Sequence, residues 1–449
     1  IELWKLGILS KTQHNEVAPA QHEMAPIYNT ANIATDHNQI VMETMKKVAR
    51  RHGLECLLHE KPFAGINGSG KHDNWSIVTN TGINLLNPGP APHDNKQFLL
   101  FLSAVIKAVD ENAPLLRLSA SNPGNDHRLG ANEAPPAIIS IFLGEQLEDI
   151  VEQIIATGTA THSIKGEKMD IGVSSIPPVK KDATDRNRTS PFAFTGNKFE
   201  FRMVASSMSI AGANTVLNTA VADVLEGMAD ELAGAADFDS AVDALIQKTL
   251  KEHQKVIFNG NGYSDEWVAE AERRGLPNVK TMVDATASLV DPKTIEIFER
   301  QNVLTKVELE SRAEINYEAY AKAINIEAKT MIEMAAKQYI PSIIKYTTSL
   351  ADSVNQIKSA CPEATVSVQT ELLTKCSALL AKAQSALNTL IEATDKGCAM
   401  EEGKEQAEFY RDSVFTAMSE LRTPIDELEM LVDKEYWPVP SYGDLIFEV

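Results

Sequence analysis

The sequence predicts an α+β protein that continues into a bundle of long helices. Two observations favour this class. Residues 198–202 alternate charged side chains with phenylalanine, as expected of a strand with one apolar face. Between residues 305 and 434, Ala/Glu/Lys-rich segments space Ala, Leu and Ile as in an antiparallel helical bundle, with helix breaks expected at Pro341, around Pro362 and at Gly397/Gly403. We therefore predict a mixed domain (1–258), an irregular or helical connection (259–304), a helical bundle (305–436) and an extended tail (437–449).

Composition excludes several classes of function. The 449 residues are 43% apolar and 23% charged, which is ordinary for a soluble globular protein. A formal charge of −20 argues against a nucleic-acid partner, because phosphates would repel it. No apolar run approaches the length of about 18 residues that spans a membrane. The four cysteines are scattered without CxxC spacing, so we expect no zinc site, no disulfide framework and a cytoplasmic location.

Three helices are predicted before residue 112. Residues 1–10 read as a short amphipathic helix that ends near Gly7. Because the chain opens without Met or a signal peptide, we expect native sequence upstream of Ile1. Residues 36–52 and 94–111 space their apolar side chains on one helical face.

Two glutamates lie in an extended segment, residues 14–23. Glu16 and Glu23 are seven positions apart, and an odd spacing sends two side chains to opposite faces of a regular strand. Pro19 cannot donate to a ladder, so a bulge or bend there would return both carboxylates to one side. The alternative is a pair of exposed acids on an edge strand.

Residues 61–75 form a glycine-rich loop with three glycines within six residues, followed by Lys71 and His72. Glycine lets a ligand approach the backbone closely, and histidine binds metals or exchanges protons. The loop fits GxxxxGK, but a P-loop requires Ser or Thr where His72 stands. The other alternative is a surface turn with a solvated histidine.

Two further stretches hold candidate site residues. Residues 119–136 have turn-forming composition, which predicts a lid or binding loop whose charged groups are Arg128 and Glu133. In residues 185–202, Phe199 and Phe201 would face a core, and the charged residues between and beside them would face solvent or a polar site. With Arg186 and Arg188 upstream, a polar site on this face would be one that binds anions and metal ions. In both stretches, the alternative is that the charged side chains are simply solvated.

Together and in this order, these stretches resemble the glutamine synthetase family. The matching motifs are Glu16 to Glu23 (paired glutamates), Asn67 to His72 (the NGSG(x)H signature), Arg128 to Pro135 (flap loop), Arg186 to Thr189 (arginines) and Glu200 to Arg202 (closing strand). The long helical C-terminus and the sequence of residues 132–136 resemble the large type III form, here without its N-terminal part. The resemblance implies a curved, mostly antiparallel sheet flanked by helices over residues 1–258.

The resemblance also implies a role for each matching residue. It implies metal ligands at Glu16, Glu23, His72 and Glu200; glutamate binding at Asn67, Gly68, Arg128 and Arg202; ATP binding at Ser76, Arg188 and Lys198; and catalytic roles for Glu133 and Arg188.

The implied reaction is ATP-dependent ligation of ammonia to the γ-carboxylate of L-glutamate through γ-glutamyl phosphate, with two or three Mg²⁺ or Mn²⁺ ions. Such chemistry depends on positioning and charge neutralisation, for which carboxylates, imidazole and arginines are suited. The resemblance further implies a homo-oligomer, a ring-based dodecamer. The alternatives are a glutamate–amine ligase of the same family and a non-catalytic scaffold fragment.

The chain departs from the family pattern at several places. Ala193 and Lys198 stand where arginines are usual, so we expect rearranged phosphate contacts. The family supplies further metal carboxylates from an upstream strand and a β-grasp domain, and residues 1–449 contain neither. We therefore expect this stretch alone to be inactive.

Overall fold

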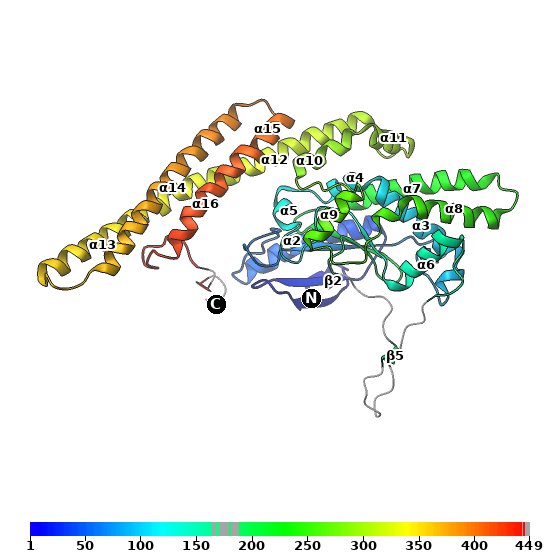
Figure 1. Ribbon diagram of the computed structural model, residues 1–449, viewed down its shortest axis with the longest axis horizontal. Helices are drawn as coiled ribbons and strands as arrows, with labels where there is room; N and C mark the ends of the chain where they lie inside the picture. Colours follow the sequence, from blue (N-terminus) through cyan, green and yellow to red (C-terminus); the bar gives the residue numbers. More distant parts are fainter. Residues whose placement is uncertain (164–167, 170–178, 181–187, 442, 445–449) are drawn as a thin grey trace. The chain divides into compact units, whose positions relative to one another are not determined.

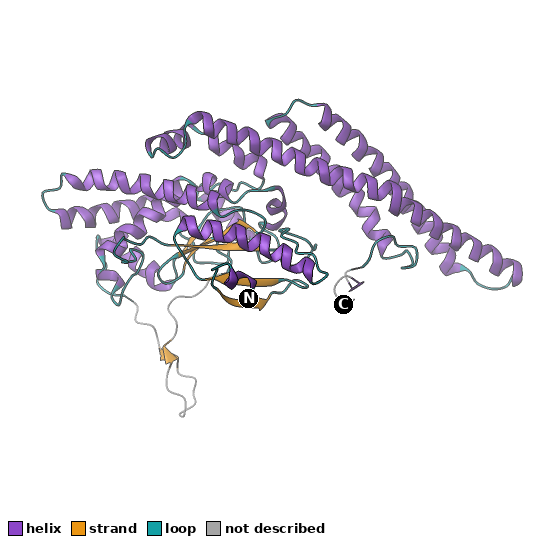
Figure 2. Ribbon diagram, turned by 180° about the vertical axis from the view of Figure 1, so that it is seen from behind, coloured by secondary structure: helices purple, strands orange, loops and turns teal. Residues whose placement is uncertain are grey.

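The structure separates into two compact units, Ile1–Glu310 and Ser311–Val449 (Figure 1). The computed structural model describes residues 1–163, 168–169, 179–180, 188–441 and 443–444. The first unit combines strands with helices, and the described part of the second is helical (Figure 2). The predicted α+β class with a helical region is confirmed. The domain bounds at 258, 304 and 436 stay a prediction.

Four described strands form the main sheet in the order β3-β8-β7-β4. They are β3 (Gly70–Trp75), β4 (Ile141–Phe142), β7 (Phe192–Phe194) and β8 (Phe199–Ala205). β8 pairs antiparallel with β3 and with β7, whereas β4 runs parallel to β7, so the sheet is mostly antiparallel. β8 is buried along its whole length, and the ring of Phe199 stacks on Phe192 at 4.8 Å between centroids. As the alternation predicts, the two phenylalanines of β8 face the core.

The N-terminal segment is a β-hairpin between two helices. Its elements are α1 (Glu2–Lys5), β1 (Ser10–Asn15), β2 (His22–Pro26) and α2 (Ala31–Arg51). Leu3 and Ile8 pack on Val41 of α2 and fix the hairpin to that helix. Residues 14–23 are therefore two strands and a turn rather than one bent strand. The register irregularity lies between Ser10 and Thr12, and not at Pro19, which sits in the turn.

Helices cover the main sheet of the first unit. They are α3 (Lys96–Glu111), α4 (Ala113–Ser119), α5 (Pro123–Arg128), α6 (Glu145–Thr157), α7 (Ala211–Ala233), α8 (Phe238–His253), α9 (Asp265–Arg273), α10 (Met282–Thr286) and α11 (Pro292–Arg300). Single 3₁₀ turns lie at Pro92–Asp94, Gln254–Val256 and Ala287–Val290, and β5 (Lys168–Met169) pairs with β6 (Val179–Lys180). Asn95 begins α3 by accepting the Phe98 amide, and α3 packs against α7 and α8.

One predicted loop is partly wrong. Residues 119–136 were expected to lack regular structure, yet α5 occupies the middle of this stretch. Asn122 caps α5 by accepting the Asn125 amide at 2.7 Å, and Pro123 takes the first helical position, where its missing N–H costs nothing. Turn-forming residues here start a short helix.

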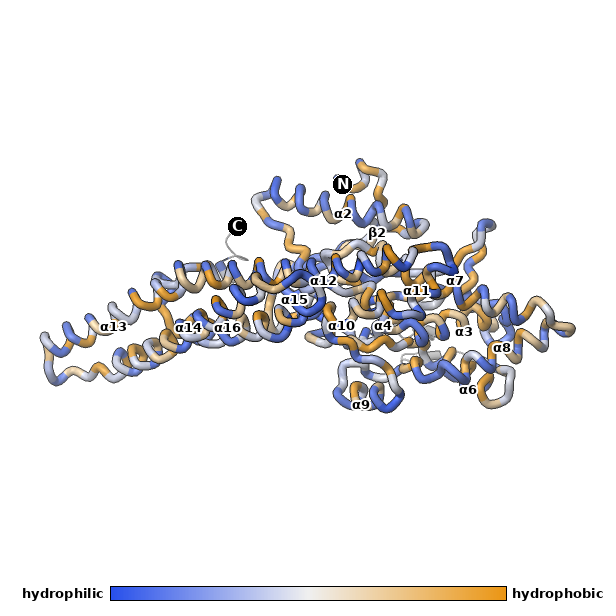
Figure 3. The backbone as a smooth tube through the Cα atoms, turned by 90° about the horizontal axis from the view of Figure 1, so that it is seen from above, coloured by the Kyte–Doolittle hydropathy of each residue, from blue (hydrophilic) through white to orange (hydrophobic). Residues whose placement is uncertain are grey.

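The second unit is built from long helices. They are α12 (Lys306–Met334), α13 (Ile340–Ala360), α14 (Ser367–Ala399), α15 (Lys404–Phe409) and α16 (Phe415–Glu429), and α12 begins within the first unit. α14 packs against α13 and α16, and hydrophobic and hydrophilic residues alternate along it (Figure 3). After α16, the ring centroids of Trp437 and Tyr339 lie 5.1 Å apart, and those of Tyr436 and Tyr346 lie 5.6 Å apart.

The expected helix break at Pro341 is wrong. A π-helical turn, Ala335–Tyr339, joins α12 directly to α13, so the chain stays helical through the proline. A second π turn, Tyr410–Val414, joins α15 to α16. Among the described residues, none of these helices combines the length and apolar character needed to cross a bilayer.

Candidate functional site

The β3–β8 pair positions His72, Glu200 and Arg202. Glu200 and Arg202 alternate on β8, so their side chains share one face. Asn74 pairs with Glu200, and His72, two positions before Asn74, lies on the same face of the sheet as Glu200. The register shifts between Lys71 and Asp73, and the extra residue of this bulge lies on β8, between Phe201 and Val204. His72 Nδ1 lies 3.3 Å from Glu200 Oε1, and Arg202 Nε donates to Glu200 Oε2 at 2.8 Å.

Glu200 remains ionised although it is only 5% exposed. Burial by itself raises the pKa of Glu200, but the His72 hydrogen bond and the Arg202 guanidinium together lower it to about 2. The charged face of β8 is therefore a buried polar site and not the solvated face that was the alternative.

The hairpin supplies a second set of polar side chains: His14, Glu16 and Glu23. His14 Nε2 lies 2.7 Å from Glu16 Oε1 and 2.9 Å from Glu23 Oε2, and one ligand atom from each residue lies within 4.8 Å of the others. Glu23 hydrogen-bonds Glu16 and lowers the pKa of Glu16, whereas burial and this bond raise the pKa of Glu23. The hairpin turn brings together the two glutamates that a regular strand would separate.

The two sets are electrostatic neighbours. The charge of His72 opposes the rise in the pKa of Glu23, and the charge of Arg188 helps to lower the pKa of Glu16. Carboxylate oxygens and imidazole nitrogens are donors that Mg²⁺ and Mn²⁺ accept, and two adjoining glutamates repel each other unless a proton or a cation lies between them. These residues therefore fit divalent cations.

Ser76 and Lys198 lie at one end of the same strand pair. Trp75 pairs with Phe199, so Ser76 and Lys198, one residue beyond on each strand, flank the same edge. Ser76 Oγ donates to Asn84 Oδ1 at 3.0 Å, and Lys198 lies in the β7–β8 turn. These two residues lie toward the Phe199 end of β8, and Arg202 toward its Ala205 end.

Arg128 lies at the Ala205 end, packed into the glycine loop. Its Nη2 donates to the Arg202 carbonyl at 3.1 Å, and the side chain is only 5% exposed. A Cβ on Gly70 would lie 2.0 Å from that nitrogen, and one on Gly68 would lie 2.4 Å from the Glu60 carbonyl. Burial lowers the pKa of Arg128 to about 10, although nearby Glu60 opposes this. The loop needs these glycines because the guanidinium and another backbone segment fill the space.

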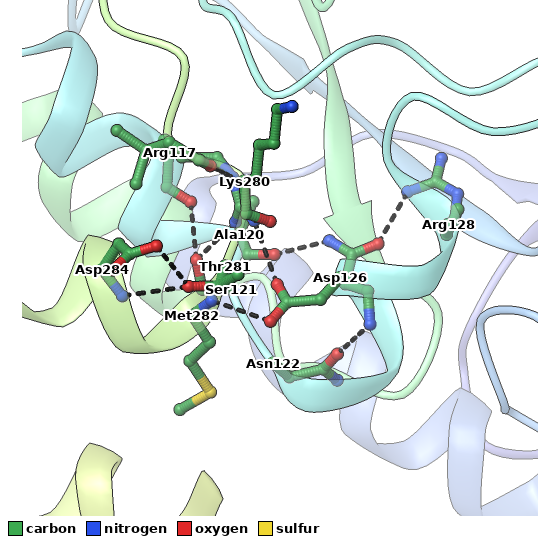
Figure 4. Close-up of polar contacts among 12 residues, drawn as sticks. Arg117, Ala120, Ser121, Asn122, Asp126, Arg128, Lys280, Thr281, Met282 and Asp284 are labelled. Atoms are coloured by element: carbon green, nitrogen blue, oxygen red, sulfur yellow. Dashed lines mark hydrogen bonds and ion pairs between the residues drawn. The ribbon is translucent and has the colours of Figure 1, made fainter. Parts of the chain in front are cut away.

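α5, which carries Arg128, is anchored on both sides. Glu60 is 2% exposed; its Oε1 accepts from Asn122 Nδ2 at 3.1 Å and from the Ser207 amide at 3.0 Å. On the other side, buried Arg117 pairs with Asp126 at 3.1 Å, and Asp126 accepts the Met282 amide at 2.8 Å (Figure 4). The position of Arg128 is therefore fixed by contacts from three distant parts of the chain.

Glu133, the predicted flap residue, contacts the glycine loop. Asn67 Nδ2 donates to Glu133 Oε2 at 2.6 Å, and Glu133 has a left-handed backbone with φ of 51°. Arg188 precedes β7, and its carbonyl accepts the Tyr263 hydroxyl at 3.2 Å. Arg186, the other arginine of this motif, lies outside the described residues.

Three residues at the site were missed by sequence reasoning. His14 lies two positions before Glu16, a spacing that puts both on one strand face, and this signal could have identified it. Glu60 and Tyr263 carry no comparable local signal, because each reaches the site through tertiary packing.

Comparison with known proteins assigns the chain to a family. Residues 2–124 match the glutamine synthetase catalytic domain, and residues 241–358 match the glutamine synthetase C-terminal domain. The chain is 46% identical to a glutamine synthetase of Butyrivibrio fibrisolvens, over 100% of this chain and 64% of that protein. It is 45% identical to the type-3 glutamine synthetase of Dictyostelium discoideum, over 99% of this chain and 62% of that protein. The apo structure of GmaS aligns with 61% of this chain and 56% of its own, at 19% identity and a TM-score of 0.36.

The chain belongs to the glutamine synthetase family. The relatives matched over its whole length include a type-3 protein, in agreement with the resemblance in the sequence. The chain spans less than two thirds of the length of these relatives.

Proposed function

We propose that the chain is the catalytic portion of a type III glutamate–ammonia ligase. The observation that carries the proposal is the order of side chains along β8. Lys198 lies just before the strand, Glu200 lies within it with its carboxylate beside His72, and Arg202 lies near Arg128. This order suits a reaction that needs nucleotide, cations and an amino-acid substrate side by side.

In the proposed reaction, a γ-carboxylate oxygen of L-glutamate attacks the γ-phosphorus of ATP, the bridging P–O bond breaks, and ADP leaves. Ammonia then attacks the acyl carbon, and the bond from that carbon to the phosphate oxygen breaks, which releases glutamine and phosphate. Bound Mg²⁺ or Mn²⁺ supplies neutralisation of phosphate charge, and Glu16, Glu23, His72 and Glu200, with His14, would hold the ions.

The other side chains bind, orient and exchange protons. In this proposal Arg128 and Arg202 hold the carboxylates of glutamate, together with Asn67 and the Gly68 backbone, while Arg188 steadies the transferred phosphoryl group. Glu133, already hydrogen-bonded to Asn67, closes the site against water and accepts the proton that ammonium loses.

We also propose ATP as the phosphoryl donor at Ser76, Arg188 and Lys198, assembly into a ring-based homo-oligomer, and a cytoplasmic location. The family supports the first two. The described cysteines are all free, which suits a reducing compartment.

The test is ADP release by the intact protein that depends on both L-glutamate and ammonium. Glu133→Ala should reduce glutamine formation by about 10²- to 10⁴-fold, the contribution of a general base, with ATP affinity nearly unchanged. Glu152→Ala, on the exposed face of α6, is the matched control. An unchanged amination rate in Glu133→Ala would refute its role, and turnover with alkylamines but not ammonium would instead favour a glutamate–amine ligase.

A further inference from the structure

A loop from outside the predicted motifs, residues 258–263, runs from the far edge of the main sheet to the site. Ile257 bridges to Ile141 of β4 in parallel, and the Phe258 amide donates to the Ile141 carbonyl at 2.8 Å. The segment therefore continues the sheet one position beyond β4. It belongs to the region that matches the family's C-terminal domain, 241–358, and not to the matched catalytic region.

The start of the loop is held by contacts of Phe258 and Asn259. Phe258 stacks on buried Trp267 of α9 with ring centroids 3.7 Å apart, and the Arg274 guanidinium lies over both rings. Asn259 Oδ1 accepts the amides of Leu143 and Gly144, each at 2.9 Å. These contacts fix the loop before any ligand binds.

The tip of the loop docks on the segment that carries Arg188. The Gly262 amide donates to Thr189 Oγ1 at 2.7 Å, and a Cβ on Gly262 would lie 2.6 Å from the Thr189 carbonyl, so the two backbones touch. Next to this contact, the Tyr263 hydroxyl donates to the Arg188 carbonyl at 3.2 Å. Tyr263 therefore fixes the backbone from which the Arg188 side chain projects.

The phenol also lies among the substrate-binding candidates. Burial, and next the Glu133 carboxylate, raise the pKa of Tyr263, while Arg202, Arg128 and Arg188 oppose this. The phenol consequently stays protonated near neutral pH and remains a donor. The charge of the Arg188 guanidinium in turn helps to lower the pKa of Glu16.

We propose that Tyr263 is a positioning residue for phosphoryl transfer: its hydroxyl holds the Arg188 carbonyl and thereby orients the Arg188 guanidinium toward the phosphoryl group that moves from nucleotide to substrate. The inference rests on the proposed function, and it assigns part of the catalytic site to the C-terminal region of the family. The ligand that Arg188 would contact is the phosphoryl group in the transition state of its transfer, with three equatorial oxygens.

Binding of a transition-state mimic separates positioning from folding. In the presence of Mg²⁺ and L-glutamate, calorimetry should show that the protein binds ADP with fluoroaluminate more tightly than ADP alone. Tyr263→Phe, which keeps the ring, should weaken binding of the mimic by about 2- to 10-fold, the worth of one hydrogen bond, and change ADP binding by less than about 2-fold. Thr189→Val, which removes the hydroxyl that anchors the loop, should have the same effect.

Tyr346→Phe, which alters a partly exposed tyrosine of the second unit, is the control and should change neither affinity. Equal losses of ADP and mimic in Tyr263→Phe, or no loss of either, would overturn the inference. If the unaltered protein does not prefer the mimic, the proposed function fails first. In that case the contact between Tyr263 and Arg188 is tested by the rate at which phenylglyoxal modifies Arg188. Modification should be faster in Tyr263→Phe than in the unaltered protein, and an equal rate would overturn the inference.

Discussion

At the residue scale, position 70 requires glycine because the Arg128 side chain occupies the space that a Cβ would need. A Cβ there would lie 2.0 Å from Arg128 Nη2, so Gly70→Ala must displace a buried guanidinium. We expect Gly70→Ala to destabilise the first unit by about 1–3 kcal/mol, the usual cost of overpacking, and to abolish glutamate binding. Denaturant unfolding and calorimetry measure the two effects.

Gly227 is the matched control, because it lies inside α7 and a Cβ there meets nothing within 4 Å. Gly227→Ala should stabilise the protein by about 0.5–1 kcal/mol through helix propensity alone. If both alanines have the same small effect, the close approach of Arg128 does not explain the glycine.

Asp73 gives the fold a pH dependence. Burial raises its pKa from 3.8 to about 6, although Asn214 donates to it at 3.0 Å and opposes the rise. Because the folded state holds the proton more tightly, stability falls as pH rises from 3.8 to about 6. Asp73→Asn should therefore be more stable than the unaltered protein at pH 8, by about 1–3 kcal/mol.

Near pH 4 this advantage should largely disappear, because buried Asp73 is then protonated and uncharged. Urea unfolding at the two pH values measures it, with Asp36→Asn on the exposed side of α2 as control. An advantage that is as large at pH 4 as at pH 8 would show that ionisation of Asp73 is not its cause.

At the element scale, α5 depends on the buried ion pair between Arg117 and Asp126. Arg117→Met would leave Asp126 buried without its cation, which costs about 3–5 kcal/mol. Burial already raises the pKa of Asp126 to about 6 despite Arg117, so the loss should be larger at pH 8 than at pH 5. Thermal unfolding at both values measures it.

Lys248→Met supplies the comparison, since it breaks an exposed ion pair with Glu231 of 3.2 Å. That change should cost less than about 1 kcal/mol. Similar losses for the two variants would mean that the buried pair does not hold α5 in place.

The same scale shows how far sequence predicts structure. β8 was predictable because the alternation of Phe199 and Phe201 with charges is a local signal. α5 was not, since its Pro-Gly-Asn-Asp composition reads as a turn, and its helix depends on Asn122 and Asp126 finding distant partners. Pro341 was misjudged for a similar reason, because a π turn before it keeps the helix intact.

The candidate site divides in the same way. Its motif residues were found because they recur in fixed local patterns, and the structure brings His72 and Glu200 together across one strand pair. Tyr263 arrives from another part of the chain, and only the packing of Gly262 on Thr189 places it. Local sequence patterns therefore predict the motif residues of a site better than they predict the residues that position them through tertiary packing.

At the scale of the whole molecule, two neighbouring donor sets predict how the chain holds metal. His14, Glu16 and Glu23 offer three side chains and His72 with Glu200 offers two, so at least half of the six positions around each ion fall to water and substrate. Ile1–Val449 alone should therefore bind Mn²⁺ weakly, with a Kd of about 0.1 mM or above, and show little ligase turnover.

Electron paramagnetic resonance measures free Mn²⁺ in such a titration. Glu16→Gln with Glu23→Gln should remove one of the two sites, whereas Glu231→Gln, on an exposed helix face, should remove neither. Sub-micromolar binding by residues 1–449, or turnover equal to that of a longer protein, would show that the ligand count is wrong.

The left-handed backbone of Glu133 has a consequence for evolution under selection. A non-glycine residue in that conformation stores about 1 kcal/mol or more of strain, which glycine would release. If Glu133 has the catalytic role that we propose, mutations that favour heat resistance and mutations that favour turnover oppose each other at this position. A laboratory lineage selected only for thermostability would tend to lose the flap carboxylate early, and would keep its fold while its chemistry decayed.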